Sequence, residues 1–443
     1  MIIGGLILLF TGITPNFTLN ANGLNVNIIP NSLSGLIAFH AQAEARDTDI
    51  GSSEFGTDEK KFGFDKDFVY TSLNNNNTQG TPTTTPPSAP PPPCEVTVDT
   101  ITGLGNAPFG IAYDSVNERI YVTNSDDNTV SVINTTTNTV ESTPITVGIE
   151  PFDIAYDRDN QRMYVTNGGD STVSVINTTT NTVDPTPITV GSAPYGIAYD
   201  YVNQRMYVTN FGDGTVSVIN TTTNTVDPTP ITVRDGPRGI AYSPDNQRIY
   251  VTNSDDNTIS VINTTTNTVD PTPITVGDGP RGIAYSPDNQ RIYVTNFGDD
   301  TVSVINTTTN TVDPTPITVG IEPFDIAYSP DNQRMYVTNG GDSTVSVINT
   351  TTNTVDPTPI TVGSAPYGIA YDLVSDRMYV ANSLDETVSV INLCWFWPYY
   401  YSIIQLQSLP KNSPIFLWLI KNNDFLYFNF IIQNTLPKKE KKD

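Results

Sequence analysis

The tetrapeptide Tyr-Val-Thr-Asn recurs along the chain at one constant interval. The copies begin at Tyr121, Tyr164, Tyr207, Tyr250, Tyr293, Tyr336 and Tyr379, 43 residues apart, and the last copy reads Tyr-Val-Ala-Asn. Each repeat holds several short runs rich in Val, Ile, Thr and Tyr. Such a unit cannot bury its own faces, so the period predicts a ring or stack of small sheets.

Within the first repeat, four runs are predicted to be strands. They cover residues 110–113, 119–123, 129–133 and 139–147, and clusters of Asn, Asp, Ser, Gly and Thr separate them. These residues favour turns, whereas β-branched and aromatic residues favour strands. Four antiparallel strands form one blade, and seven repeats predict an all-β, seven-bladed β-propeller.

The two ends of the repeat region complement each other. Residues 96–102 precede the first blade and match only the fourth strand of a repeat, whereas the last repeat stops at Asn392 after its third strand. We therefore predict that the N-terminal strand completes the last blade. A ring closed in this way leaves no long sheet edge unpaired.

The Tyr-Val-Thr-Asn motif, its following Asp, and the run Thr-Val-Ser-Val-Ile-Asn resemble the YVTN β-propeller repeat of archaeal surface-layer proteins. The resemblance covers residues 94–392. It implies an extracellular propeller that serves as an interaction or surface-coat module. A WD40 propeller is excluded because its blades need Gly-His and Trp-Asp pairs, whereas the only histidine is His40 and all tryptophans follow the repeats.

Both cysteines flank the ring. When Cys94 and Cys394 are shifted by whole repeats, they fall in one hairpin, at positions 137 and 136. This places them within reach of a disulfide that would fasten the closed ring. The alternative is two unrelated thiols.

Outside the propeller, the chain consists of four segments that differ in amino-acid composition. Residues 1–45 resemble a signal or leader segment with two apolar runs but no preceding basic residue, 46–70 are polar, and 71–93 form an Asn/Thr/Pro-rich linker. Residues 393–443 form an aromatic and apolar tail with a basic end. Three interpretations of this tail are open: membrane association, a shifted reading frame, and an additional packed element.

The chain has a formal net charge of −25, and all nine lysines lie outside the repeats. A strongly acidic ring repels phosphate backbones, so nucleic acid is excluded as a partner. The predicted location is extracellular or at the cell surface.

One face of the ring should collect a set of side chains around the channel. Each blade has a proline before its first strand, and the residue after it is aromatic in five blades and arginine in two: Phe109, Phe152, Tyr195, Arg238, Arg281, Phe324 and Tyr367. We predict a ligand-binding channel mouth in which the aromatic rings stack on a sugar or peptide and the arginines hold an anion. The alternative is that the rings are wedges between blades.

The next position is glycine in five blades but Asp153 and Asp325 in the second and sixth, each preceded by a glutamate, Glu150 and Glu322. Carboxylates are ligands for Ca²⁺, so these four residues are the candidates for a metal site. They lie on blades that face each other across the ring. No other cofactor is predicted.

Six Asn-Thr-Thr sequons recur on the opposite face of the ring, and they predict a glycoprotein in an exported chain. Their asparagines are Asn134, Asn177, Asn220, Asn263, Asn306 and Asn349. The alternative is that Asn-Thr is turn chemistry copied with the repeat.

The repeats contain no histidine or lysine, so the usual catalytic bases are missing. The sequence therefore favours a non-catalytic, secreted or surface-attached propeller that binds surface proteins, glycans or peptides. The alternative is a metal-dependent hydrolase or lyase, similar to a lactonase, that uses the channel carboxylates.

Overall fold

The computed structural model describes residues 18–21, 24–27, 96–393, 415–421 and 424–430. The chain divides into two compact units, 1–87 and 88–443. In the first unit, β1 (Thr18–Ala21) and β2 (Leu24–Asn27) pair as an antiparallel hairpin. In the second, β37 (Ile415–Lys421) pairs with β38 (Asp424–Phe430) in the same way, and all other described strands lie within residues 96–393.

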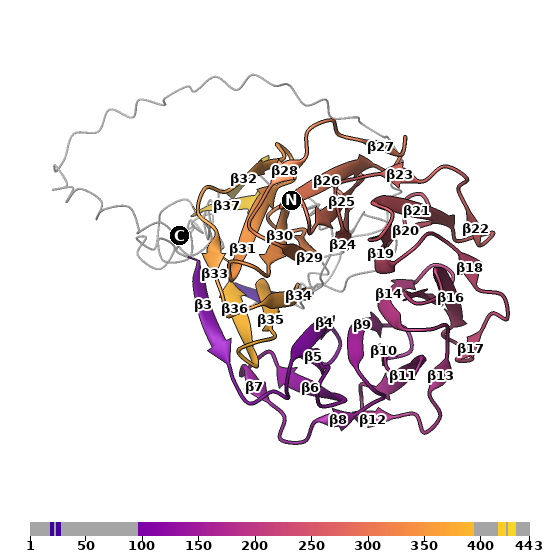
Figure 1. The fold of residues 1–443 in the computed structure, drawn as a ribbon. Helices are drawn as coiled ribbons and strands as arrows, with labels where there is room; N and C mark the ends of the chain where they lie inside the picture. Colours follow the sequence, from indigo (N-terminus) through magenta and orange to yellow (C-terminus); the bar gives the residue numbers. More distant parts are fainter. Residues whose placement is uncertain (1–17, 22–23, 28–95, 394–414, 422–423, 431–443) are drawn as a thin grey trace, which may run out of the picture. The chain divides into compact units, whose positions relative to one another are not determined.

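Residues 96–393 form a seven-bladed β-propeller (Figure 1), as predicted. The first strand of each blade lies innermost: β4 (Pro108–Asp114), β9 (Pro151–Asp157), β14 (Pro194–Asp200), β19 (Pro237–Ser243), β24 (Pro280–Ser286), β29 (Pro323–Ser329) and β34 (Pro366–Asp372). The second strands carry the repeated motif: β5 (Arg119–Asn124), β10 (Arg162–Asn167), β15 (Arg205–Asn210), β20 (Arg248–Asn253), β25 (Arg291–Asn296), β30 (Arg334–Asn339) and β35 (Arg377–Asn382). The third strands are β6 (Thr129–Asn134), β11 (Thr172–Asn177), β16 (Thr215–Asn220), β21 (Thr258–Asn263), β26 (Thr301–Asn306), β31 (Thr344–Asn349) and β36 (Thr387–Asn392).

The predicted fourth strand is wrong as one continuous element, because it consists of two short pieces that both pair with the third strand. The first pieces are β7 (Thr139–Val140), β12 (Thr182–Val183), β17 (Thr225–Val226), β22 (Thr268–Val269), β27 (Thr311–Val312) and β32 (Thr354–Val355). The second are β8 (Ile145–Thr146), β13 (Ile188–Thr189), β18 (Ile231–Thr232), β23 (Ile274–Thr275), β28 (Ile317–Thr318) and β33 (Ile360–Thr361). In blades 2 to 6 the sequence Asp-Pro-Thr-Pro separates the pieces, and proline cannot donate a ladder hydrogen bond.

Ring closure follows the prediction. The N-terminal strand β3 (Thr97–Ile101) pairs antiparallel with β36, from Thr97 opposite Asn392 to Ile101 opposite Val388. The strand is unbroken because it contains no proline. The last blade is thus built from both ends of the repeat region (Figure 1). Cys94 and Cys394 lie outside the described residues, so the disulfide stays a prediction.

The hydrophobic core consists of seven layers between neighbouring blades. Residues of the second strand alternate between two layers: Ile120 and Val122 pack toward the last blade, whereas Tyr121 packs with Met163 and Val165 of the next blade. The second strand is therefore buried on both faces. No blade has a complete core of its own, which explains why the repeats fold as a ring.

The repeated tetrapeptide binds each blade to the next. The Tyr121 hydroxyl donates to Asn181 Oδ1 at 2.6 Å, and the Thr123 hydroxyl donates to the carbonyl of Phe152 at 2.7 Å. Six of the seven interfaces have the tyrosine bond. One of them is the seam, the interface between the last and the first blade, where Tyr379 donates to Asn138. Six also have the threonine bond.

The seam lacks the threonine bond because the last motif carries Ala381. This side chain is fully buried at the interface with the first blade. The other six blades accommodate threonine at the equivalent position, so Ala381→Thr should fit and donate to the carbonyl of Phe109. We expect the substitution to raise the free energy of unfolding by about 0.5–1.5 kcal/mol, measured by urea denaturation.

The matched control for this prediction is Thr123→Ala, which removes the same bond from a complete interface and should lower stability by a similar or larger amount. If the Ala381→Thr variant unfolds at the same or a lower urea concentration than the parent, the assignment of the hydroxyl to an interblade bond is contradicted.

Candidate functional site

The seven residues predicted at the channel mouth come together in the structure. A shift in strand register between Pro108 and Ile111 marks a β-bulge in β4, and the same irregularity recurs in the innermost strand of every blade. A bulge re-aims a side chain relative to the regular alternation of a strand. The bulge contains the aromatic or arginine position, so the repeat presents this residue to the channel in each blade.

The five aromatic rings pack on one another rather than line an open funnel. The ring of Phe109 lies 5.1 to 5.8 Å from the rings of Phe152, Tyr195, Phe324 and Tyr367, measured between centroids. Phe152 stacks on Tyr195 at 5.0 Å, and Phe324 lies 4.3 Å from Tyr367. The prediction that these residues share one site agrees with this geometry, but their faces are largely occupied by each other.

Arg238 and Arg281 complete this cluster on adjacent blades. The Arg238 guanidinium lies 5.0 Å from the ring centre of Tyr195, and that of Arg281 lies 4.8 Å from Phe324. Burial, and then the charge of Arg238, lower the pKa of Arg281. The negative face of an aromatic ring attracts a cation, which stabilises each guanidinium group. The two cations also repel each other.

Asp153 and Asp325 occupy a position where the other blades require glycine. A Cβ at Gly110, Gly196 or Gly368 would lie well inside contact distance of a carbonyl oxygen on a neighbouring blade. The two aspartates fit here with their carboxylates accepting backbone hydrogen bonds. Asp153 Oδ2 accepts from the N–H of Ile197 at 3.0 Å, and Asp325 Oδ2 accepts from Ile369 at 3.2 Å.

Both carboxyl groups titrate near neutral pH. Removal from water raises the pKa of Asp153 to about 6, although the N–H groups of Ile197 and Ile154 lower it in part. The same desolvation, followed by repulsion from the charge of Asp153, raises the pKa of Asp325 to about 7. The two groups lie close enough for their charges to interact, although they stand on blades 2 and 6.

The two glutamates that were predicted as metal ligands are exposed, whereas Asp153 and Asp325 are removed from water. Glu150 and Glu322 are exposed in the loops that enter blades 2 and 6. Within the part of the chain that the structure describes, no group of three or more Asp, Glu, His or Cys residues could hold a metal ion. The structure therefore does not join the glutamates with the aspartates in a cluster of metal ligands among the described residues.

The sequon asparagines cap the turns after the third strands. Asn134 Oδ1 accepts hydrogen bonds from the N–H groups of Thr136 and Thr137 at 3.0 and 3.1 Å, and the other five asparagines make the same pair of bonds. These turns lie beside the loops between first and second strands, since Thr135 N–H donates to the carbonyl of Glu118. Turn stabilisation accounts for the Asn-Thr repeat, and glycosylation stays a prediction.

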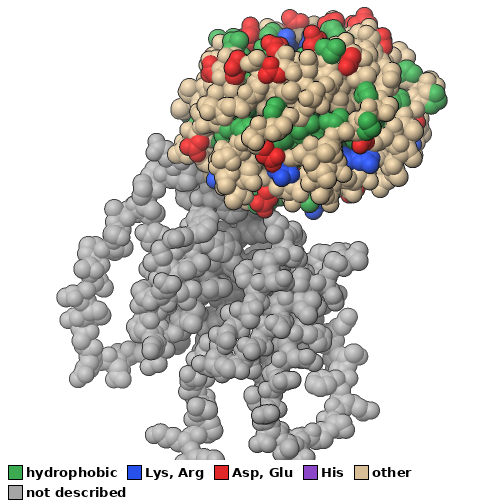
Figure 2. All heavy atoms as spheres, turned by 90° about the horizontal axis from the view of Figure 1, so that it is seen from below, with side chains coloured by type: hydrophobic (Ala, Val, Ile, Leu, Met, Phe, Trp, Pro, Cys, Tyr) green, Lys and Arg blue, Asp and Glu red, His purple; other side chains and the backbone are tan. Residues whose placement is uncertain are grey.

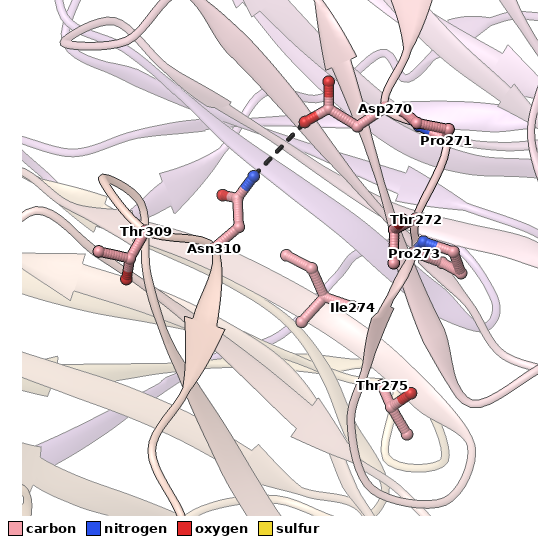
Figure 3. Close-up of a pocket in the computed structure, with 8 residues that line it drawn as sticks. All are labelled: Asp270, Pro271, Thr272, Pro273, Ile274, Thr275, Thr309 and Asn310. Carbon is pink, nitrogen blue, oxygen red and sulfur yellow. Dashed lines mark hydrogen bonds between the residues drawn. The ribbon is translucent and has the colours of Figure 1, made fainter.

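A separate hollow lies at the rim between blades 4 and 5 (Figure 3). It measures about 500 Å³ and is lined by Asp270, Pro271, Thr272, Pro273, Ile274, Thr275, Thr309 and Asn310. Asn310 Nδ2 donates to Asp270 Oδ2 at 3.4 Å across it. Equivalent asparagine-to-carboxylate bonds join other blades, so the hollow follows from the repeat and shares no residue with the channel mouth.

The surface of the ring is predominantly acidic. Figure 2 shows many acidic and few basic side chains on the side of the propeller. No helix among the described residues is long and apolar enough to cross a membrane. A membrane contact through residues 393–443 stays a prediction.

Comparison with known proteins identifies the family. The model of the virginiamycin B lyase family matches residues 94–390. The chain belongs to this family. The expectation of a non-catalytic protein is therefore wrong, because the family is defined by a lyase. The absence of histidine and lysine from the repeats does not exclude an enzyme, since carboxyl groups with raised pKa values can also act as acids and bases. A comparison with curated proteins gave no match.

Solved structures share the fold at low identity. Kuenenia stuttgartiensis hydrazine synthase is 20% identical with a TM-score of 0.59, and the alignment covers 66% of this chain and 97% of that chain. Virginiamycin B lyase from Staphylococcus aureus is 19% identical with a TM-score of 0.58, covering 68% and 100%. A streptogramin B lyase is 17% identical with a TM-score of 0.57, covering 68% and 98%.

The raised pKa values of Asp153 and Asp325 make stability depend on pH. The ordinary pKa of 3.8 applies to the unfolded chain, so between about pH 4 and 7 the folded protein binds more protons than the unfolded one. Stability should therefore fall as pH rises through this window. We expect the free energy of unfolding of the protein to fall by up to about 7 kcal/mol more than that of a double variant with Asp153→Gly and Asp325→Gly, measured by urea denaturation from pH 4 to 8.

Glycine is the residue of the other five blades at this position, so the double variant follows the repeat. Equal pH dependence in both proteins would show that the two carboxyls titrate normally.

Proposed function

We propose that the channel is the catalytic centre of a lyase and that Asp153 and Asp325 are its base and acid. The observation that carries the proposal is the pair of carboxyls with pKa values of about 6 and about 7. Interacting sites titrate as a pair, so near pH 6.5 the pair holds roughly one proton. One carboxylate is then free to accept a proton while the other carboxyl can donate one.

The chemistry that suits this pair is elimination. The carboxylate removes a proton from the carbon next to a carbonyl group, the C–H electron pair forms a C=C bond, and the bond from the neighbouring carbon to oxygen breaks. The protonated carboxyl stabilises the departing oxygen by a hydrogen bond or protonates it. No water is consumed, which separates a lyase from a hydrolase. Virginiamycin B and streptogramin B, the compounds for which the relatives are named, are the substrates to test first.

We further propose that this activity operates outside the cell or at its surface, where the propeller would meet small esters and also surface proteins or glycans. The leader-like segment 1–45 and the linker 71–93 support this setting, as does the resemblance to surface-layer repeats. Accessibility of the ring to protease added to intact cells tests it.

The activity test uses isosteric variants. Asp153→Asn and Asp325→Asn each remove a proton-transferring group while keeping its size, so we expect kcat to fall by about 10²- to 10⁴-fold with a smaller change in KM. The exposed Asp126→Asn is the matched control and should be fully active. Mass spectrometry of the product distinguishes elimination, which leaves the mass of a ring-opened ester unchanged, from hydrolysis, which adds one water.

Turnover that survives both substitutions, or a product that contains an added water, would contradict the proposal.

A further inference from the structure

Arg238 and Arg281 form a pair of cations that the protein does not neutralise. Four arginines on the rim have carboxylate partners, such as Arg119 with Glu141 at 3.0 Å and Arg248 with Asp270 at 2.6 Å. Among the described residues, no carboxylate lies within 4 Å of Arg238 or Arg281. The charge of Glu322 raises the pKa of Arg281, but by less than burial and the charge of Arg238 lower it.

Each of the two guanidinium groups lies over the faces of two aromatic rings. Arg281 lies 3.4 Å from the ring centre of Phe297 and 4.8 Å from that of Phe324. Arg238 lies 4.7 Å from Phe211 and 5.0 Å from Tyr195. The polar N–H groups of a guanidinium lie in its plane, so stacking on the faces leaves the edges for hydrogen bonding.

The hydrogen-bonding capacity of these edges is almost unused. Arg238 Nε donates to the hydroxyl of Ser254 at 3.1 Å, and within residues 96–393 Arg281 donates to no protein acceptor. A partly buried guanidinium has five donors, and leaving them without partners costs free energy. The aromatic rings fix the orientation of both guanidinium groups, and their unpaired donors lower the stability of the protein. A ligand that accepts hydrogen bonds from these donors would recover that free energy, as in a preorganised binding site.

We infer that Arg238 and Arg281 bind the oxyanion of a small ligand, a phosphate or a carboxylate. The planar fork of arginine matches two oxygens of either group. An anion would also relieve the repulsion between the two cations, which the structure otherwise tolerates. The inference does not depend on catalysis by Asp153 and Asp325. Where both hold, the substrate of the lyase carries a negative charge.

Calorimetric titration of the full chain tests the inference with four probes: inorganic phosphate, phenyl phosphate, benzoate and neutral benzamide. We expect at least one anion to bind more tightly than benzamide, and the comparison of phosphates with benzoate identifies the preferred oxyanion. Arg281→Gln and Arg238→Gln should each weaken binding by about 10- to 100-fold, as expected for a charge-assisted bond. Arg234→Gln removes an exposed arginine from a nearby loop and should leave binding unchanged.

A second measurement covers the case in which a variant fails to fold. In the unmodified protein, the side-chain ¹⁵N–¹H resonances of two arginines should shift when the bound anion is added and return when it is dialysed away. Equal affinity for benzamide and the anions, equal weakening by Arg234→Gln, or unshifted arginine resonances would overturn the inference. Loss of turnover with intact anion binding would instead indicate failure of the proposed catalytic role alone.

Discussion

The hydrogen bonds between neighbouring blades are the interaction on which the propeller depends. Tyrosine and threonine of the repeated motif each reach the next blade, while the intervening valine packs toward the previous one. A single motif thus explains both the regular period and the absence of an independent core in any blade. Two interfaces near the closing blade differ: Ala381 lacks the hydroxyl, and the Tyr336 hydroxyl accepts from Asn332 Nδ2 of its own blade at 2.8 Å.

Ring closure creates the chemical environment of the channel. Seven bulged inner strands direct one side chain each toward a common mouth, where five rings and two guanidinium groups pack together. Beside them, Asp153 and Asp325 replace glycine and lose solvation, which brings their pKa values toward neutrality. The two aspartates with raised pKa values and the two arginines therefore arise from a few departures from the repeat, on blades 2, 4, 5 and 6.

Much of the fold could be predicted because the period is explicit in the sequence. The 43-residue interval, the unmatched strand at 96–102 and the truncated last repeat were sufficient to predict seven blades and their closure. The split of the fourth strand was missed, although the two prolines of Asp-Pro-Thr-Pro signal it. At the channel, the sequence predicted which side chains come together, but it could not show that Phe109 contacts four other rings or that burial raises the pKa values of Asp153 and Asp325. The expectation of a non-catalytic protein was wrong because it rested on the absence of histidine and lysine from the repeats.

The account rests on the pairing of β3 with β36, since the channel exists only in a closed ring. The most direct measurement compares small-angle scattering and thermal unfolding of the full chain with those of a variant that lacks residues 94–104. The account predicts that the deletion exposes β36, lowers the unfolding temperature sharply and produces an opened or self-associating particle. An unchanged unfolding temperature with an unchanged compact ring would contradict it.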